Sequence, residues 1–377
     1  MRAVALVDGE HYPAVVRDAL TALPYDWVGV ILVGGTEKLR EPPEYGVPVV
    51  DGFAGAELVV DLSDEPVLGP AERFRWVSRA LAAGLPYVGA DFRFDPPQLE
   101  PFELPSIGVI GTGKRVGKTA VTGHLARLLR RDRSVVVVAM GRGGPPEPEL
   151  VERPPTVHEL VARSRAGRHA ASDHLETAAV AGVPTIGCRR AGGGLAGAVS
   201  TSNVSAGARL AAERAPDLVI FDGSGAAIPP VATDRRILVV GAKQDADAYL
   251  NTYRRLISDL VLSVDCEVEG ALPVTLRLRA LEPLDGRVAV FTAGGSDVSH
   301  LEAEVVHVST SLGDRPALTR ELAGLDADTY LVEVKAAAID VVAVHALAND
   351  RRVVLAANDV VPLAGNLDSA LLELAPV

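Results

Sequence analysis

Residues 106–129 contain the feature that most constrains the fold of this chain. Residues 106–110 form a short apolar run that predicts a buried strand, and Val121, Leu125 and Leu129 have the spacing of one helical face. Between the two segments lies a glycine-rich stretch that ends in Gly-Lys-Thr. A strand, a glycine-rich loop, Gly-Lys-Thr and a helix in this order predict a phosphate-binding loop, the P-loop.

The chemistry of this loop predicts a site for a nucleotide and a magnesium ion. Glycines allow backbone N–H groups to point at phosphate oxygens, the helix N-terminus adds partial positive charge, and Lys118 reaches the terminal phosphates. Thr119 offers a hydroxyl to Mg²⁺. The spacing departs from the strict P-loop pattern, because Thr112 stands where the first glycine is expected and the loop carries an additional Lys114. The residues predicted to bind ATP are Gly111, Thr112, Gly113, Lys114, Arg115, Val116, Gly117, Lys118, Thr119 and Ala120.

Composition excludes several classes of function. The 377 residues are 48% apolar but only 4% aromatic, which suits an α/β interior built from small aliphatic side chains. The net charge of −12 argues against a general attraction to nucleic acid or to an anionic membrane. No apolar run approaches the ~20 residues that span a bilayer. Two cysteines, far apart in the sequence, predict a reduced, cytoplasmic environment. The eight histidines lack metal-ligand spacing, so a zinc protease is excluded.

The pattern of apolar runs predicts an α/β protein with two doubly wound domains. Residues 1–95 form a Rossmann-like domain, the proline-rich residues 96–105 form a stiff linker, and residues 106–377 form a P-loop nucleotide-binding fold with a mostly parallel sheet. The strands predicted in the first domain are residues 3–7, 28–33, 47–50, 58–62 and 87–89, and its better helices are residues 13–23 and 70–83. The strands predicted after the P-loop are residues 134–139, 185–188, 217–221, 237–240, 288–292, 329–334 and 353–356.

Strand ends also supply candidate metal ligands. The strand predicted at residues 217–221 ends in Asp222, and a carboxylate beside a P-loop can hold Mg²⁺, although an aspartate in this position can also cap the next turn. Glu147 and Glu149 are available to bind Mg²⁺ or to accept a proton, or they are solvated acids of an exposed, proline-rich loop. We predict that the metal ligands are Thr119, Asp222 and Glu147.

Basic side chains near other strand ends are candidates for binding an anionic substrate. Arg142 lies between glycines and can approach a phosphate closely. Arg189 and Arg190 precede three glycines, and paired guanidinium groups followed by a backbone nest suit a substrate with two or more anionic groups. Lys335 is a phosphate ligand or a surface lysine, and His11 follows the first strand, where open sheets bind ligands. The predicted substrate-binding residues are His11, Arg142, Arg189, Arg190, Gly192, Gly193 and Lys335, and the predicted catalytic residues are Lys114, Lys118 and Arg142.

Together these segments resemble the cyclic 2,3-diphosphoglycerate synthetase family over nearly the whole chain. The P-loop resembles the form found in the dethiobiotin-synthetase-like branch of P-loop proteins. A P-loop alone is shared by many families, whereas the loop of two arginines and three glycines and the segment that begins at Lys335 are more specific. The segments that carry the resemblance are residues 8–12, 111–120, 140–145, 171–176, 188–194 and 335–340.

The resemblance implies an N-terminal α/β domain, a nucleotide-binding second domain and a homodimer. It also implies ATP-dependent closure of 2,3-diphosphoglycerate into its cyclic pyrophosphate, and the related formation of 2,3-diphosphoglycerate from 2-phosphoglycerate. The expected partners are ATP, Mg²⁺ and a phosphorylated glycerate, with no nucleic acid and no membrane.

Two other classes stay open. One is a different ATP-dependent ligase of the dethiobiotin-synthetase type, and the other is a nucleotide-dependent switch or metallochaperone. The chain lacks the Cys/His runs typical of a metallochaperone. Residues 239–247 resemble the guanine-reading pattern Asn-Lys-x-Asp only loosely, which favours ATP over GTP.

Overall fold

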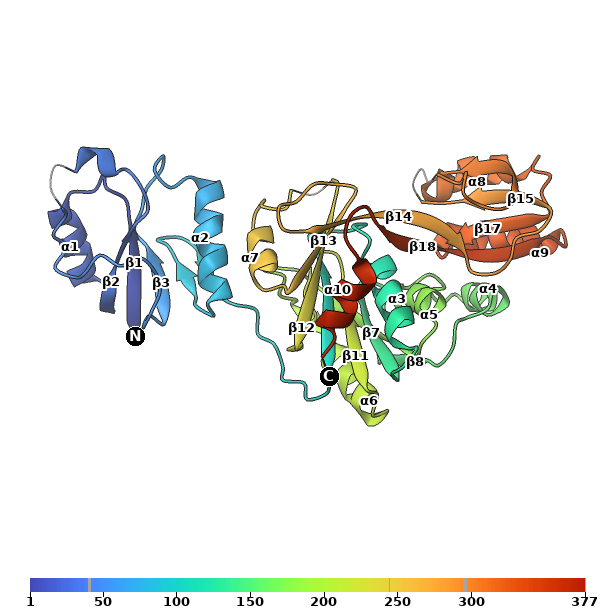
Figure 1. Ribbon diagram of the computed structural model, residues 1–377, viewed down its shortest axis with the longest axis horizontal. Helices are drawn as coiled ribbons and strands as arrows, with labels where there is room; N and C mark the ends of the chain where they lie inside the picture. Colours follow the sequence, from blue (N-terminus) through green and yellow to red (C-terminus); the bar gives the residue numbers. More distant parts are fainter. Residues whose placement is uncertain (40–41, 244, 294–296, 377) are drawn as a thin grey trace. The chain divides into compact units, whose positions relative to one another are not determined.

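The computed structural model describes residues 1–39, 42–243, 245–293 and 297–376. The chain divides into two compact units (Figure 1). The N-terminal unit contains residues 1–98 together with residues 245–257, and the second unit contains the rest of the described chain. The inclusion of residues 245–257 differs from the boundaries expected from the sequence. In the N-terminal unit, helix α7 (Asn251–Leu256) packs against α2 (Pro70–Ala82), and the rings of Phe74 and Tyr249 meet edge to face.

The N-terminal unit is built on a five-stranded sheet with the order β2-β1-β3-β4-β5. The first four strands of this order run parallel, and β5 is antiparallel to β4. Because β2 and β3 lie on opposite sides of β1, the ends of β1 and β3 flank the point where the winding reverses, the usual position of a ligand in such sheets. The strands are β1 (Arg2–Val7), β2 (Asp26–Leu32), β3 (Leu58–Asp61), β4 (Tyr87–Val88) and β5 (Arg93–Phe94), and the other helices are α1 (Pro13–Ala22) and the short 3-10 turn Thr36–Lys38.

The strand predicted at residues 47–50 is wrong. Only an isolated bridge between Val30 and Val49 forms there. The physical reason lies in Pro48, which has no N–H to donate to a ladder, so that its carbonyl accepts a hydrogen bond from Val30 but the pairing does not extend.

The second unit contains a long sheet in which the described strands follow the order β10-β9-β7-β11-β6-β12-β13-β14-β18-β17-β15-β16, with β8 pairing to β9. The strands from β9 to β14 run parallel, β14 and β18 are antiparallel, and the last four are again parallel to one another. The strands are β6 (Ser106–Gly111), β7 (Val135–Gly141), β8 (Glu149–Val151), β9 (Thr185–Ala191), β10 (Thr201–Ser202), β11 (Leu218–Asp222), β12 (Arg235–Gly241), β13 (Leu260–Val264), β14 (Leu272–Ala280), β15 (Arg287–Phe291), β16 (Glu304–Ser309), β17 (Thr329–Glu333) and β18 (Arg352–Pro362).

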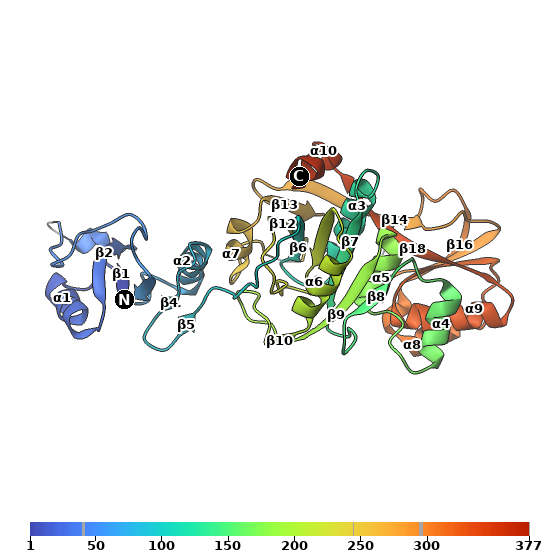
Figure 2. The ribbon, with the colours of Figure 1, turned by 90° about the horizontal axis from the view of Figure 1, so that it is seen from below.

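Helices cover both faces of this sheet, which confirms the predicted α/β class with a mostly parallel sheet. Along β7, Val135 and Val137 join the core under α3 and α10, whereas Val136, Val138 and Met140 join the core under α6 on the opposite face (Figure 2). Continuous apolar strands are required because neither face meets water. The helices are α3 (Lys118–Leu129), α4 (Val157–Arg165), α5 (Asp173–Ala181), α6 (Val204–Glu213), α8 (Arg315–Leu322), α9 (Val344–Ala348) and α10 (Leu367–Leu374), with a π-helical turn at Ala338–Ala343 and a 3-10 turn at Ser311–Gly313.

The close packing of α3 on α5 positions the two helix N-termini that contribute to the candidate site. A Cβ placed on Gly123 of α3 would lie 2.4 Å from Cγ1 of Val180 in α5. Val180 cannot easily turn away, because a β-branched side chain has one strongly preferred rotamer in a helix.

We expect Gly123→Ala to lower the free energy of unfolding by about 1–3 kcal/mol, although alanine is the better helix former. Urea denaturation followed by circular dichroism measures the change. Combining the substitution with Val180→Ala should recover part of the loss. Gly324→Ala is the matched control, because a Cβ there meets open space. Equal stabilities of the Gly123 variant and the wild type would contradict the packing argument.

Candidate active site

The P-loop joins β6 to α3, and two of its glycines are required by close contact or by backbone conformation. Gly117 adopts the left-handed conformation, with φ at +99°, immediately before α3. At Gly111, a Cβ would lie 2.8 Å from Cγ2 of Val116 and 3.1 Å from Cδ of Lys118. The Lys118 side chain therefore folds back over the end of β6, where its ammonium group donates a hydrogen bond of 3.1 Å to the carbonyl oxygen of Gly113.

The Lys118 ammonium is buried beside the end of β11. Only 8% of the residue is exposed, and burial lowers the pKa of its ammonium, while the charges of Asp222 and Asp173 oppose that effect. Burial in turn raises the pKa of the Asp222 carboxyl to about 7, against the opposing charge of Lys118. Asp222 ends β11, which pairs directly with β6. The strand order thus places the predicted acid next to the P-loop lysine.

Three basic side chains from separate segments of the chain meet at Gly225, three residues beyond Asp222. Gly225 has a φ of +61°, and a Cβ placed on it would lie 3.0 Å from Nη2 of Arg142, 3.5 Å from Nη2 of Arg190 and 3.7 Å from Cγ of Lys114. The structure therefore brings together Lys114, Arg142 and Arg190, three of the cationic residues singled out in the sequence. We refer to these three residues as the Gly225 cation cluster.

Arg190 is the buried member of this cluster. Its guanidinium donates 2.8 Å to the carbonyl oxygen of Ser224 and also donates to the carbonyl of Gly192, while its Nε is buried without a partner among the described residues. Burial lowers the pKa of Arg190, and the charge of Arg142 lowers it further. A Cβ on Gly193 would lie 3.3 Å from Nη1 of Arg190, so the glycines after β9 allow the backbone to approach the guanidinium closely.

Arg189 lies elsewhere. It precedes Arg190 on β9, and because successive strand residues point to opposite faces, its side chain leaves the strand on the other face and is exposed. The backbone N–H of Arg189 donates 2.7 Å to Oδ1 of Asn203, and no described contact joins its guanidinium to the Gly225 cation cluster. The pair of arginines predicted from the sequence is therefore split between two faces.

Neither of the two acids predicted after β7 has a described contact with Lys118. Glu147 is exposed and has no described hydrogen bond or ion pair. Glu149 accepts two hydrogen bonds of 2.6 Å from Arg163, which hold the pKa of its carboxyl below the ordinary value. The described contacts of Glu149 involve no residue of the P-loop.

Helix α5 brings two acids to the site. The sequence leaves Asp173 open between an ordinary helix start and a residue that lines a site, and Glu176 is not among the predicted site residues. Asp173 begins the helix, and its Oδ2 lies 2.8 Å from where a Cβ on Gly141 would be, at the end of β7. Glu176 accepts two hydrogen bonds of 2.7 Å from the ammonium of Lys335, which follows β17. Lys335 is thus held by a carboxylate. The signal was present in the segment 171–176, which carries the family resemblance, but its pattern is also that of an ordinary helix start.

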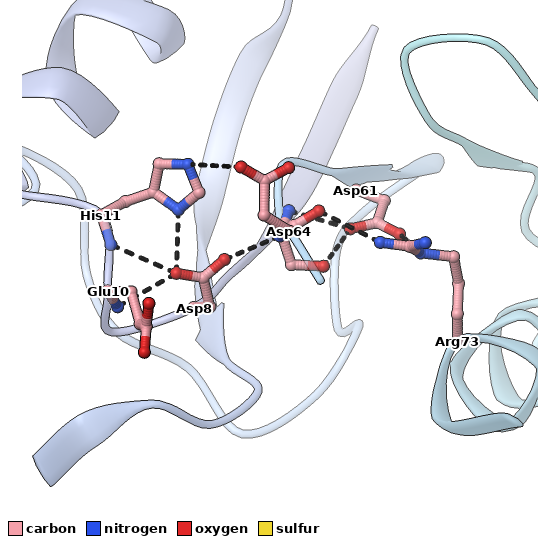
Figure 3. A network of polar contacts seen from close by, with 7 residues as sticks. Asp8, Glu10, His11, Asp61, Asp64 and Arg73 are labelled. Carbon is pink, nitrogen blue, oxygen red and sulfur yellow. Dashed lines mark hydrogen bonds and ion pairs between the residues drawn. The ribbon is translucent and has the colours of Figure 1, made fainter. Parts of the chain in front are cut away.

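His11 belongs to the N-terminal unit and is held in a network at the ends of β1 and β3 (Figure 3). Its Nδ1 lies 2.8 Å from Oδ1 of the fully buried Asp8, and its Nε2 lies 3.4 Å from Oδ2 of Asp64. Burial alone would raise the pKa of Asp8, but hydrogen bonds from Asp64 and His11 lower it below the ordinary value. Beside this network, Asp61 accepts 2.8 Å from Nε of Arg73.

The fit to a magnesium ion can be tested on the donor atoms present. Oδ1 of Asp222 is buried and has no hydrogen-bond partner in the described part of the chain, and Thr119 lies in the first turn of α3. A carboxylate and a hydroxyl are ligands that Mg²⁺ accepts when nucleotide phosphates and waters complete its shell. Within the described residues, no group of three or more His, Cys, Asp or Glu is arranged to hold a metal ion unaided. The residues fit a cation shared with a nucleotide.

A P-loop that joins the carboxyl end of a buried central strand to a helix, in a mostly parallel sheet, defines a P-loop nucleotide-binding fold. Family profiles described as the N-terminal, P-loop and C-terminal domains of cyclic 2,3-diphosphoglycerate synthetase match residues 2–55 and 52–95, 106–275, and 292–359 in turn. The chain belongs to the cyclic 2,3-diphosphoglycerate synthetase family and is an enzyme. Among its described helices, none combines the length and apolarity needed to cross a membrane.

Similar proteins extend over the full chain. The cyclic 2,3-diphosphoglycerate synthetase of Rubrobacter xylanophilus is 46% identical, with 100% of this chain and 97% of that protein covered. The protein of the same name from Thermococcus gammatolerans is 41% identical, with coverage of 98% and 96%. Among solved structures, LpxK from Aquifex aeolicus in complex with ATP aligns with a TM-score of 0.44 and 16% identity over 74% of this chain and 89% of that one, a likeness too low to bear on function.

The burial of His174 generates a pH prediction for α5, the helix that carries Asp173 and Glu176. The His174 ring packs on Gly187 of β9, and burial lowers its pKa to about 4 from an ordinary value of 6.5. The imidazole of His174 therefore takes up a proton near pH 6.5 in the unfolded chain but only near pH 4 in the folded chain. The contribution of neutral His174 to the free energy of unfolding is fully present above pH 6.5 and is lost as the pH falls toward 4.

We expect the wild type to lose up to about 3 kcal/mol of unfolding free energy through this group between pH 7 and pH 4. His174→Gln should flatten the pH profile by that amount, whatever its stability at pH 7. Denaturant midpoints measured at several pH values give both profiles. Parallel profiles would show that His174 does not titrate in this way.

Proposed function

We propose that this enzyme closes 2,3-diphosphoglycerate into its cyclic pyrophosphate at the expense of ATP. The family supports the substrate, because the relatives that match over the full chain bear the name of this reaction product. The observation that carries the proposal is the Gly225 cation cluster next to the P-loop lysine, since it gathers Lys114 of the P-loop, Arg142 after β7 and Arg190 of β9.

Ring closure requires that two mutually repelling phosphates of one small molecule be held close together. At ~4 Å, two unit charges repel by about 4 kcal/mol at an effective dielectric constant near 20. Guanidinium groups offset this repulsion well, because each fork can bind two phosphate oxygens. In this proposal Arg142 and Arg190 hold the substrate phosphates, and Lys118 with Lys114 stabilises the charge that develops on the γ-phosphoryl group of ATP.

The proposed reaction has two displacements. An oxygen of one substrate phosphate attacks the γ-phosphorus of ATP, the bond to the bridging oxygen breaks, and ADP leaves. An oxygen of the other substrate phosphate then attacks the phosphorus of the activated substrate phosphate, the new phosphoanhydride breaks, and inorganic phosphate leaves as the ring forms. A phosphate oxygen is already a nucleophile at neutral pH, so this sequence needs no strong general base among the side chains.

Mg²⁺ accompanies ATP in this proposal, with Thr119 and Asp222 as its protein ligands. A bound Mg²⁺ would neutralise phosphate charge during the transfer. The predicted contributions of His11, Gly192, Gly193 and Lys335 to substrate binding stay predictions, as do a 2-phosphoglycerate kinase activity, a homodimer and a cytoplasmic location. They rest on the family resemblance and on the reduced state expected of the two cysteines.

We expect purified protein with ATP, Mg²⁺ and 2,3-diphosphoglycerate to give a new upfield pyrophosphate resonance in ³¹P NMR, together with ADP and inorganic phosphate. The physical reason is that a phosphoanhydride phosphorus is shielded relative to a phosphomonoester. A parallel reaction with 2-phosphoglycerate tests the kinase activity. ATP consumption with 2-phosphoglycerate alone would assign the chain to that kinase activity, and no stimulation by either compound would reject the proposed substrate.

The split between Arg189 and Arg190 predicts unequal effects of two neighbouring substitutions. Arg190→Ala should raise the KM for the glycerate substrate at least tenfold, because it removes a buried fork from the Gly225 cation cluster, whereas Arg189→Ala should change it much less. Steady-state kinetics with saturating ATP give both values. Equal increases would favour the paired arrangement expected from the sequence over the one the strand geometry supports.

A further inference from the structure

Asp173 stands at the sheet edge that carries the P-loop. As the first residue of α5 it is exposed, and its carboxylate lies against Gly141, where a Cβ would meet Oδ2 at 2.8 Å and Cγ at 3.2 Å. Gly141 ends β7, the strand next to β11 in the sheet. The carboxylates of Asp173 and Asp222 are therefore placed over the ends of neighbouring strands.

The charges around Asp173 come from several elements. On α3, the charge of Asp173 opposes the lowering of the Lys118 pKa by burial, and on β11 it adds to the raised pKa of Asp222, of which burial is the main cause. It also acts on Arg190 of β9, and on the Glu176–Lys335 ion pair. Asp173 thus faces both acids and bases of the site rather than one fixed partner.

Two carboxylates at this edge have free oxygen atoms. Within the described residues, Asp173 accepts no hydrogen bond and forms no ion pair, although basic groups surround it. Independently, Oδ1 of Asp222 is buried and has no hydrogen-bond partner in the same part of the chain. Asp222 is only 4% exposed. The charge of Lys118 and the Thr122 hydroxyl act on its carboxyl, but its unpaired Oδ1 leaves a position that a cation can fill.

A helix N-terminus accounts for part of the placement of Asp173. An acid in the first turn stabilises the helix dipole by about 0.3–1 kcal/mol. A carboxylate directed at solvent would stabilise the helix dipole equally well. The helix dipole also does not explain why Oδ1 of Asp222 has no described hydrogen-bond partner. The carboxylate lies over the sheet edge beside Gly141, in space that a side chain at that position would fill.

We infer that Asp173 supplies a second carboxylate to a divalent cation that Asp222 and a bound nucleotide hold at this edge, the role that the sequence assigned to Glu147. This inference rests on the proposed binding of ATP. Mg²⁺ in such sites uses one or two carboxylates and fills its other positions with phosphate oxygens and waters. A pair consisting of Asp173 and Asp222 meets that requirement with no third protein carboxylate.

The test measures nucleotide affinity with and without metal, because a ligand and a charged neighbour predict opposite results. Removing a negative charge near the site favours an anionic nucleotide, so Asp173→Asn should bind a fluorescent ADP analogue as tightly as the wild type, or more tightly, in EDTA. With Mn²⁺ present, the variant should bind the metal–nucleotide complex about tenfold more weakly than the wild type does. Mn²⁺ electron paramagnetic resonance of the ADP complex measures the metal affinity directly.

Glu213→Gln, at the end of α6, is the matched control, because it removes one exposed carboxylate that has no described ion pair. Gly141→Ala is the second variant, since its new Cβ displaces the Asp173 carboxylate without removing it, and it should also weaken Mn²⁺ binding. Unchanged Mn²⁺ affinity in the folded Asp173 and Gly141 variants would overturn the inference. Neither measurement contains a glycerate, so a failure of the proposed substrate would leave the result intact, whereas a wild type that binds no nucleotide would overturn both.

Discussion

The buried ammonium group of Lys118 is the constraint on which the rest of the site depends. An unpaired charge in the interior costs several kcal/mol, so the fold must surround it with compensating groups. The carbonyl of Gly113 and the carboxylate of Asp222 provide that compensation before any ligand binds. An anionic ligand that takes over the ammonium would leave Asp222 in need of another cation. The same electrostatic balance therefore couples nucleotide binding to metal binding.

The parallel sheet brings the charged residues of the site together, because the carboxyl ends of its parallel strands lie on the same side of the sheet. Strands β6, β7, β11 and β9 are neighbours, and Lys118, Arg142, Asp222 and Arg190 lie at or shortly after their carboxyl ends. Side-chain alternation then selects among adjacent residues. Arg190 points into the site and Arg189 out of it for no reason other than their parity on β9.

The sequence predicted what depends on local pattern. The P-loop with its strand and helix, the apolar central strands and the acid at the end of β11 follow from motif and periodicity, and the structure has each of them. Strand β14 was not predicted, although its alternation of apolar and polar residues is a strand signal. Its antiparallel pairing with β18 could not be predicted from local pattern, because its register depends on a partner about 80 residues away in sequence. Asp173 was left open, as either a helix start or a residue that lines a site, for a related reason. A helix-starting aspartate is locally ordinary, and only the tertiary contact with Gly141 distinguishes it.

The position of Lys335 after a buried strand was predicted correctly, but that position does not decide whether the lysine binds phosphate. The lysine does follow a buried strand, as a phosphate ligand would, but Glu176 binds its ammonium through both carboxylate oxygens. Burial raises the pKa of Glu176 and would lower that of Lys335, yet the attraction between them raises the pKa of Lys335 overall. The pair is thus a neutral unit that joins the end of β17 to α5. For Lys335 to contribute net positive charge to a phosphate, it must first leave Glu176, and that separation would expose a second free carboxylate one helical turn from Asp173.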